Sequence, residues 1–389
     1  MNNATNTQGS QSSLTPSEDG TVAVPRASID WYRSLPWWRL LSQSIVISWR
    51  ASHLLLAGIA IWLTYAGWLL SEKTFAPQGI TASSLFTDRN LHPTFEFAGA
   101  CWHSISEAAE APITVRRLAY FAFGFLWTTA VWSFAGGLLA RRSLMEMGVR
   151  TSVGWGPSCR LVRQRWLSMI WAICMPIIAI VGLALIPLGL GLFARFGVIG
   201  QSISLIFMLP AVVLSIGIGW CAAISMFGFP LSICAISAEK NADAFDGVAR
   251  SAAYVFQRPM TILTIGLLAI GLGWLGDTII RTILSCGEQV VWASFSMGFG
   301  SNIRDQLGEE ALFRKSLISI GKAFIPTLQA AFLVSFFWST AAAAYLTLRW
   351  EIDNTDFDDL DLQELGEPVQ LPSFKQDSRG VSEIAEATS

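Results

Sequence analysis

The chain has 389 residues, of which 52% are hydrophobic and only 14% are charged. Since an average soluble protein carries roughly 25% charged residues, this composition excludes a disordered chain and argues against an ordinary soluble enzyme. The formal net charge of −2 gives no reason to expect nucleic acid as a partner.

The N-terminal region divides into a polar tail and a Trp-rich segment. Residues 1–28 are rich in Ser, Thr, Asn and Gln, which predicts a disordered tail, and no cleavable signal peptide is visible. Residues 31–51 alternate Trp with Arg. Because Trp prefers the lipid headgroup region and Arg prefers anionic lipid, this segment is predicted to be an interfacial helix that contacts membrane lipid.

Long runs without charged residues dominate residues 29–350 and predict a transmembrane domain. A bilayer core about 30 Å thick needs about 20 apolar helical residues. The runs therefore predict an all-α, polytopic helix bundle with about six crossings. These lie near 53–70, 118–140, 167–194, 198–227, 260–285 and 317–348. Residues 289–302 are too short to span and suit an interfacial or re-entrant segment.

The uncharged stretch 196–238 is longer than one simple crossing and contains Pro210 and Pro230. We favour a single helix near 198–227, a turn at residues 228–230, and a short apolar segment that returns to the surface. Two tightly turned helices are the alternative. Ser215, Gly219 and Ala223 recur every four residues, so neighbouring backbones can approach closely there.

The distribution of Lys and Arg residues indicates which way the six crossings are oriented in the membrane. One side, which includes both tails and the Arg-rich loop 141–166, holds about twice as many Lys and Arg residues as the other. The positive-inside rule then predicts both termini in the cytoplasm.

Residues 240–257 predict an amphipathic helix between the fourth and fifth crossings, because their apolar residues repeat at helical spacing. Asn241 is expected to cap its start, Asp243 and Asp246 suit the positive end of the helix dipole, and Pro259 stops it. A packing linker is the simplest interpretation, and a docking surface or gating element is the alternative.

This region also carries a resemblance to a known family. The residues concerned are Pro230, Glu239, Asp243, Phe245, Asp246, Arg250, Ser251, Arg258 and Pro259, together with the end of the last helix from Phe337 to Arg349 and the acidic Asp353 and Asp356. The pattern, over roughly 200–360, resembles a family of uncharacterised polytopic bacterial membrane proteins, and this resemblance implies a bacterial cytoplasmic (inner) membrane. It is more distantly similar to the membrane domain attached to some glycerophosphodiester phosphodiesterases. The chain has no phosphodiesterase catalytic domain, so that activity is not implied.

Asp277 and Arg281 are four residues apart in the fifth crossing. Charges inside a membrane helix are costly and often functional, and this spacing lets the two side chains neutralise each other. They could form a structural ion pair near the non-cytoplasmic end. In a transporter, they would instead line a polar path together with Gln201 or Gln329.

Other polar patterns give weaker hypotheses. His92 and Glu96, and His103 and Glu107, could each share a helical face, yet no third His lies near enough to complete a metal site. Cys101 and Cys286 could both face the outside and form a disulfide. Residues 351–389 begin with an acidic run that does not match an EF-hand loop, and they are predicted to be a disordered tail.

These observations lead to one interpretation and one alternative. We expect a non-enzymatic integral membrane protein, acting as a structural, assembly or accessory component, whose partners are membrane lipids and other membrane proteins. We expect no catalytic or metal residue set and no cofactor. The alternative is a transporter or permease with a polar path near Asp277 and Arg281.

The six-crossing topology is testable with a reporter fused within residues 72–116. We expect this loop on the non-cytoplasmic side, because the flanking loops carry the basic excess. Alkaline phosphatase fused there should be active and green fluorescent protein dark. The reverse pattern would rule out a topology with both termini inside.

Overall fold

The computed structural model describes residues 36–75, 114–306, 312–361, 374–376 and 382–384. Its helices are α2 (Pro36–Ser48), α3 (Ala51–Phe75), α6 (Val115–Gly148), α7 (Trp155–Phe193), α8 (Gly197–Ile206), α9 (Met208–Ala223), the π-helix η1 (Ile224–Gly228), α10 (Phe229–Ala238), α11 (Ala244–Gln257), α12 (Pro259–Gln306) and α13 (Leu312–Asp353). The strands β1 (Phe374–Gln376) and β2 (Ser382–Ile384) form a short antiparallel pair.

Within these ranges, six helical stretches are long and apolar enough to cross a membrane. The predicted all-α membrane bundle is therefore confirmed, and the chain has the build of a multi-pass membrane protein. The six stretches are Ala51–Phe75, Val115–Gly148, Trp155–Phe193, Met208–Ala238, Pro259–Val291 and Ile325–Asp353.

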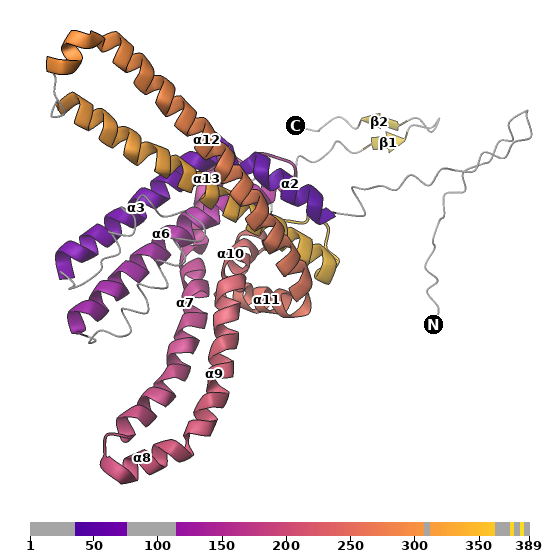
Figure 1. The fold of residues 1–389 in the computed structure, drawn as a ribbon. Helices are drawn as coiled ribbons and strands as arrows, with labels where there is room; N and C mark the ends of the chain where they lie inside the picture. Colours follow the sequence, from indigo (N-terminus) through magenta and orange to yellow (C-terminus); the bar gives the residue numbers. More distant parts are fainter. Residues whose placement is uncertain (1–35, 76–113, 307–311, 362–373, 377–381, 385–389) are drawn as a thin grey trace, which may run out of the picture. The chain divides into compact units, whose positions relative to one another are not determined.

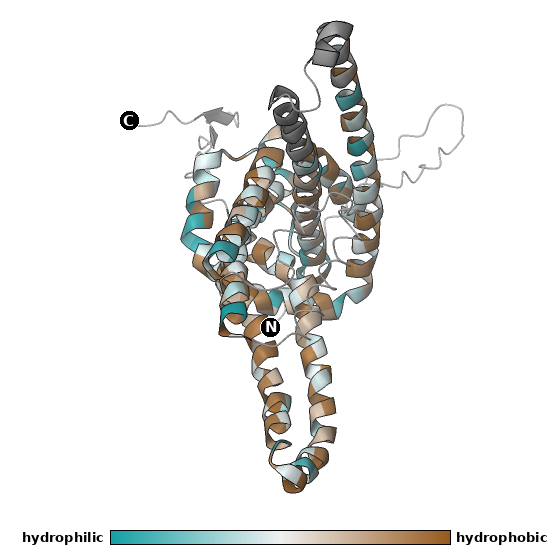
Figure 2. Cartoon of the chain, turned by 60° about the vertical axis from the view of Figure 1, so that its left-hand side comes forward, coloured by the Kyte–Doolittle hydropathy of each residue, from teal (hydrophilic) through white to brown (hydrophobic). Residues whose placement is uncertain are grey.

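Neighbouring stretches pack as antiparallel pairs: α3 on α6, α7 on α9, and α12 on α13 (Figure 1). α13 is the central helix, because it also contacts α3, α6 and α10, and most of its span is buried. Less than a third of each of the other five spans is buried, as in helices that face lipid. Figure 2 shows hydrophobic residues along these helices.

Glycines allow the helices of the core to approach one another. Gly136 of α6 lies directly against the indole of Trp338 of α13, and a Cβ at this glycine would overlap the ring. Trp338 is almost fully buried, in a core that also includes Leu139 and Ala342. Because the hydrophobic effect does not drive helices together in lipid, membrane helices commonly gain packing contacts by close approach at small residues.

The fourth crossing differs from the favoured prediction of a helix over 198–227 followed by a turn. α8 joins α7 to α9, with Gly197 at a positive φ of 73°, and the crossing runs from Met208 to Ala238. The expected turn at 228–230 is replaced by the wider π-helical η1. A proline in an α-helix lacks one donor and clashes with an earlier carbonyl, so the wide turn before Pro230 lets the helix continue.

Several other boundaries lie beyond the predicted ones. Helix α12 continues through residues 289–302, which are not a separate interfacial segment. α6 and α7 extend past the apolar runs into the Arg-rich loop, and Arg141 in the extension of α6 is fully buried. The prediction of a disordered tail over 351–389 is wrong for the described part, since α13 ends at Asp353, Leu360 and Asp361 are buried, and β1 and β2 pair.

Some predictions lie outside the described residues. These are the tail 1–28, the loop with His92, Glu96, His103, Glu107 and Cys101, and the end of the acidic run. The surface helix expected over 31–51 is described from Pro36 as α2, and it ends at Ser48.

The contact between Gly136 and Trp338 predicts that a methyl group added at Gly136 destabilises the protein. Gly136→Ala should lower the free energy of unfolding by about 1–3 kcal/mol, because the added carbon overlaps a buried ring. Gly266→Ala is the control, since a Cβ there meets nothing within 4 Å. Thermal unfolding in one detergent compares the two variants, and equal midpoints would contradict the packing argument.

Candidate functional site: the ion-paired polar end of the bundle

One end of the bundle collects most of its described ion pairs. We call it the polar end: α6, α10 and α13 finish there, and α3, α7 and α12 begin there. Arg50, just before α3, pairs with Glu146 near the end of α6. Thr261 at the start of α12 donates to Glu351 at the end of α13, with 3.2 Å between the oxygens. The polar end thus joins the ends of separate helices.

The C-terminus of α10 is buried there, and its backbone carbonyls need hydrogen-bond donors. Arg165 of α7 supplies two, donating from Nη1 to the carbonyl oxygens of Ile236 at 2.8 Å and Glu239 at 2.6 Å. A guanidinium is well suited to this place, because it brings several donors and a positive charge to the negative end of the helix dipole.

Arg141 of α6 supplies a third donor. Its side chain is fully buried, and Nη1 donates to the carbonyl of Ser237 at 2.8 Å. The carbonyl of Ala238 accepts from the backbone N–H of Asp361 at 2.9 Å. The last three carbonyls of α10, which have no partner within the helix, are thus all paired. Their donors come from distant parts of the chain.

Glu239 follows α10 directly and is the centre of a side-chain network. Its Oε1 lies 2.9 Å from Nε of Arg349 and accepts a hydrogen bond of 2.8 Å from the hydroxyl of Tyr345. Both partners belong to α13 and are buried. The pair therefore ties the end of α10 to the end of the central helix.

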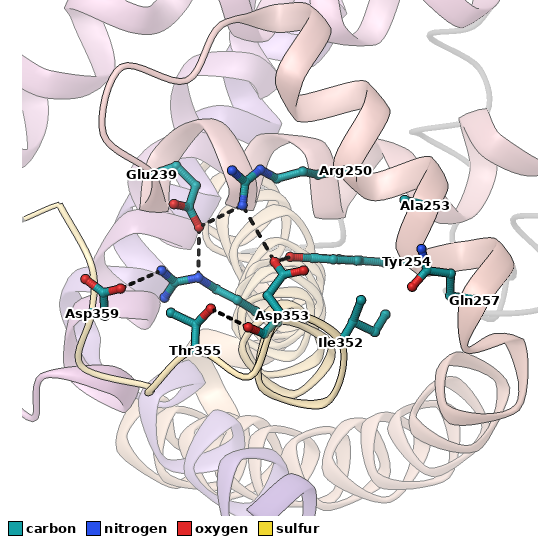
Figure 3. A pocket seen from close by; sticks show the side chains of 10 residues that line it. Glu239, Arg250, Ala253, Tyr254, Gln257, Ile352, Asp353, Thr355 and Asp359 are labelled. Carbon is teal, nitrogen blue, oxygen red and sulfur yellow. Dashed lines mark hydrogen bonds and ion pairs between the residues drawn. The ribbon is translucent and has the colours of Figure 1, made fainter. Parts of the chain in front are cut away.

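Arg250 of the amphipathic helix α11 lies between two carboxylates. It is 3.6 Å from Glu239 and 3.7 Å from Asp353, which in turn accepts a hydrogen bond of 2.5 Å from Tyr254. Figure 3 shows Arg250 and Tyr254 pointing toward Asp353. The side chain of Arg250 is 45% exposed, so it is the most accessible cation of this network.

These contacts shift the pKa values of two side chains on α11, Arg250 and Tyr254. Burial disfavours the charged form of Arg250, but the carboxylate of Glu239 and the nearby tyrosines outweigh it and raise the pKa of Arg250. Burial, and then the hydrogen bond to Asp353 and its charge, raise the pKa of Tyr254. At neutral pH, Arg250 is a cation and Tyr254 a hydrogen-bond donor.

A pocket of about 560 Å³ opens beside this network (Figure 3). Its walls come from Glu239, which follows α10, from α11 and α13, and from the segment that follows α13. Ion-paired side chains make up half of the lining, and Gln257 and Thr355 add further polar groups. Among the described residues, no group of three or more His, Cys, Asp or Glu side chains could hold a metal ion.

Residues 354–361 form an acidic segment that folds back over the polar end. Asn354 has a positive φ of 52°, which turns the chain at the end of α13. The ring of Phe357 stacks on Trp350 with 6.0 Å between centroids. Asp359 pairs weakly with Arg349 at 3.5 Å, and Asp361 pairs strongly with Arg165 at 2.6 Å.

The residues of the family-like pattern fall into two groups. Glu239 and Arg250 belong to the network just described, and the buried Ser251 supports the packing of α11 beside Gly228. The others shape the helices or are exposed. Pro230 starts α10, Asp243 caps α11, Asp246 donates its backbone N–H to that cap at 2.8 Å, Phe245 and Arg258 are exposed, and Pro259 starts α12. Asn241, expected as the cap, has a positive φ of 59° and precedes the helix.

Asp277 and Arg281 lie apart from this site, within α12. They make the expected contact, with 3.2 Å between Arg281 Nη2 and Asp277 Oδ2. Asp277 is almost fully buried, whereas the side chain of Arg281 is 44% exposed. The other carboxylate oxygen, Oδ1, has no hydrogen-bond partner in the described part of the chain.

Sequence reasoning missed Arg141, Arg165 and Asp361 as site residues and counted the arginines only as loop charges. One signal was present for α6: Leu144 and Met147 continue its apolar spacing beyond Arg141, which places the arginine inside the helix. No comparable signal pairs Asp361 with Arg165, which are 196 residues apart.

The network predicts a large effect for the loss of one carboxylate. Glu239→Gln keeps the size of the side chain but leaves the buried Arg349 with only its long pair to the exposed Asp359. We expect a loss of about 3 kcal/mol in the free energy of unfolding. Asp359→Asn, at a 73% exposed side chain, should cost less than about 1 kcal/mol. Thermal unfolding of both variants tests this, and similar losses would refute the central role of Glu239.

No known protein-family model matches this chain, and no curated protein or solved structure is significantly similar to it. The resemblance drawn from the sequence therefore stays a prediction.

Proposed function

We propose that the protein is a non-enzymatic integral membrane protein that acts as a structural, assembly or accessory component. The observation that supports this most is the pairing at the polar end. Glu239, Arg349 and Arg165 are each engaged with groups on other helices or on the 354–361 segment. Such pairing holds helix ends in fixed positions, which suits a protein whose role is to present a stable surface.

The proposed location is a bacterial cytoplasmic membrane with both termini inside. In support, the basic residues near the described helix ends are divided unequally. The polar end holds Arg50, Arg141, Arg142, Arg150, Arg160, Arg163, Arg165, Lys240, Arg250, Arg258 and Arg349, whereas the opposite helix ends hold Lys73, Arg116, Arg117 and Arg195. The positive-inside rule assigns the end with more Lys and Arg to the cytoplasm. Lipids and other membrane proteins are the partners that the exposed apolar helices would meet.

Transport is the second candidate, and Asp277 is the observation that favours it. A buried carboxylate in a membrane helix, with one oxygen paired and the other unpaired, is costly unless it is protonated or binds something. A transporter would expose this side chain to water during its cycle, whereas a packed structural pair would keep it closed.

Single-cysteine accessibility along residues 266–285 of α12 separates the two candidates. In a cysteine-free background, a membrane-impermeant thiol reagent should label only the outermost turn if the bundle is packed. We expect Asp277→Cys to stay unlabelled, because the site is 1% exposed. Arg258→Cys, at an exposed position before α12, is the positive control in inside-out vesicles.

Labelling that recurs at helical spacing and includes Asp277→Cys would overturn the structural proposal in favour of transport. Protection by a solute that permeates proteoliposomes would then identify the substrate class. Confinement of labelling to the last turn, beyond Arg281, supports the structural role.

A further inference from the structure

The end of the 354–361 segment is bound like a ligand. Asp361 is held by its backbone N–H, by its carbonyl and by its carboxylate, which contact α10, Arg141 of α6 and Arg165 of α7 respectively. Its side chain is 2% exposed. Three different parts of the protein thus bind one residue, and two of them bind its backbone.

The neighbouring Leu360 is recognised by shape. It is buried in the main hydrophobic core, and Gly148 at the end of α6 makes room for it. A Cβ at Gly148 would lie 2.9 Å from Cδ1 of Leu360 and would overlap the carbonyl of Phe357. The site therefore selects a Leu-Asp pair: an apolar side chain at the first position and a carboxylate at the second.

The groups that bind Asp361 are held in place without it. Arg165 is anchored by the carbonyls of Ile236 and Glu239, and Arg141 by the carbonyl of Ser237. Departure of the segment would leave both guanidiniums in position, still directed by the end of α10. The binding site is therefore preformed, which lowers the cost of binding.

The rest of the segment is loosely attached. Asp356 and Asp358 are exposed. The ion pair of Asp359 with Arg349 is long, and the side chain of Asp359 is 73% exposed. Exposed pairs of this kind contribute little to stability. Phe357, which stacks on Trp350 and has the guanidinium carbon of Arg39 5.5 Å from its ring centroid, holds the segment down together with Leu360 and Asp361.

We propose that Arg141, Arg165, Gly148 and the end of α10 form a recognition site for an acidic peptide segment that carries Leu-Asp, and that residues 357–361 are its resident, detachable ligand. While bound, the segment closes the polar end. When it leaves, the same site takes an equivalent acidic segment from another protein. This inference does not depend on whether the protein is a structural component or a transporter.

A displacement experiment tests the proposal on the full chain in lipid nanodiscs. The probe is a fluorescent peptide with the sequence of residues 354–363, and binding is followed by fluorescence anisotropy. The protein variant Leu360→Ala/Asp361→Asn disables the resident ligand and keeps the site. We expect this variant to bind the peptide at least about tenfold more tightly than the wild type, where the tethered segment competes at an effective concentration of order 1 mM.

Changes in the peptide serve as matched controls and leave the protein intact. The substitution D361N in the peptide should weaken binding roughly tenfold, because it removes a charge-assisted hydrogen bond to Arg165. D358N, at an exposed acid, should leave binding unchanged. Equal binding of the D361N and unmodified peptides, or equal binding to wild-type and variant protein, would overturn the proposal.

Hydrogen exchange of the wild-type protein gives a second test that needs no variant. A detachable segment predicts that amides of 357–361 exchange at least about tenfold faster than those of residues 234–238 in α10, because the segment opens without unfolding the helix. Equal protection of the two stretches would show that the segment is a fixed part of the core and would refute the proposal.

Discussion

The buried C-terminus of α10 imposes the constraint on which the polar end depends. A helix end that lies inside a bundle cannot leave its carbonyls to water, and each unpaired one costs free energy comparable to a lost hydrogen bond. Here the donors are two arginines from α6 and α7 and one backbone N–H from the segment after α13. The arrangement of these elements around α10 follows from the need to deliver those donors.

This constraint explains why α6 and α7 are longer than their apolar runs. Arg141 and Arg165 must reach α10 from rigid positions, and a continued helix supplies that rigidity better than a loop. It also explains why the charges are buried without being isolated. Both guanidiniums donate to carbonyls at the negative end of the α10 dipole, and Arg165 also pairs with the carboxylate of Asp361, so the cost of desolvation is offset locally.

The sequence predicted the parts of the fold that depend on local composition. Apolar length located six spans, and helical spacing located α11. The fourth crossing was misplaced because Pro230 was read as a turn, whereas the π-helical η1 absorbs a proline within a continuous span. Of the site, Glu239 and Arg250 were singled out by their pattern. Arg165 and Asp361 were not, because their pairing joins positions 196 residues apart and has no local signature.

The contact between Arg141 and Asp361 also bears on how the protein is made. The two residues are 220 positions apart, and Asp361 follows the last span. During synthesis, α6, α7 and α10 therefore enter the membrane while the carbonyl of Ala238 still lacks its donor. Closure of the polar end therefore cannot precede the synthesis of residue 361, which follows all six candidate spans. A chain that stopped after α13 would contain every apolar helix and still lack the group that completes α10.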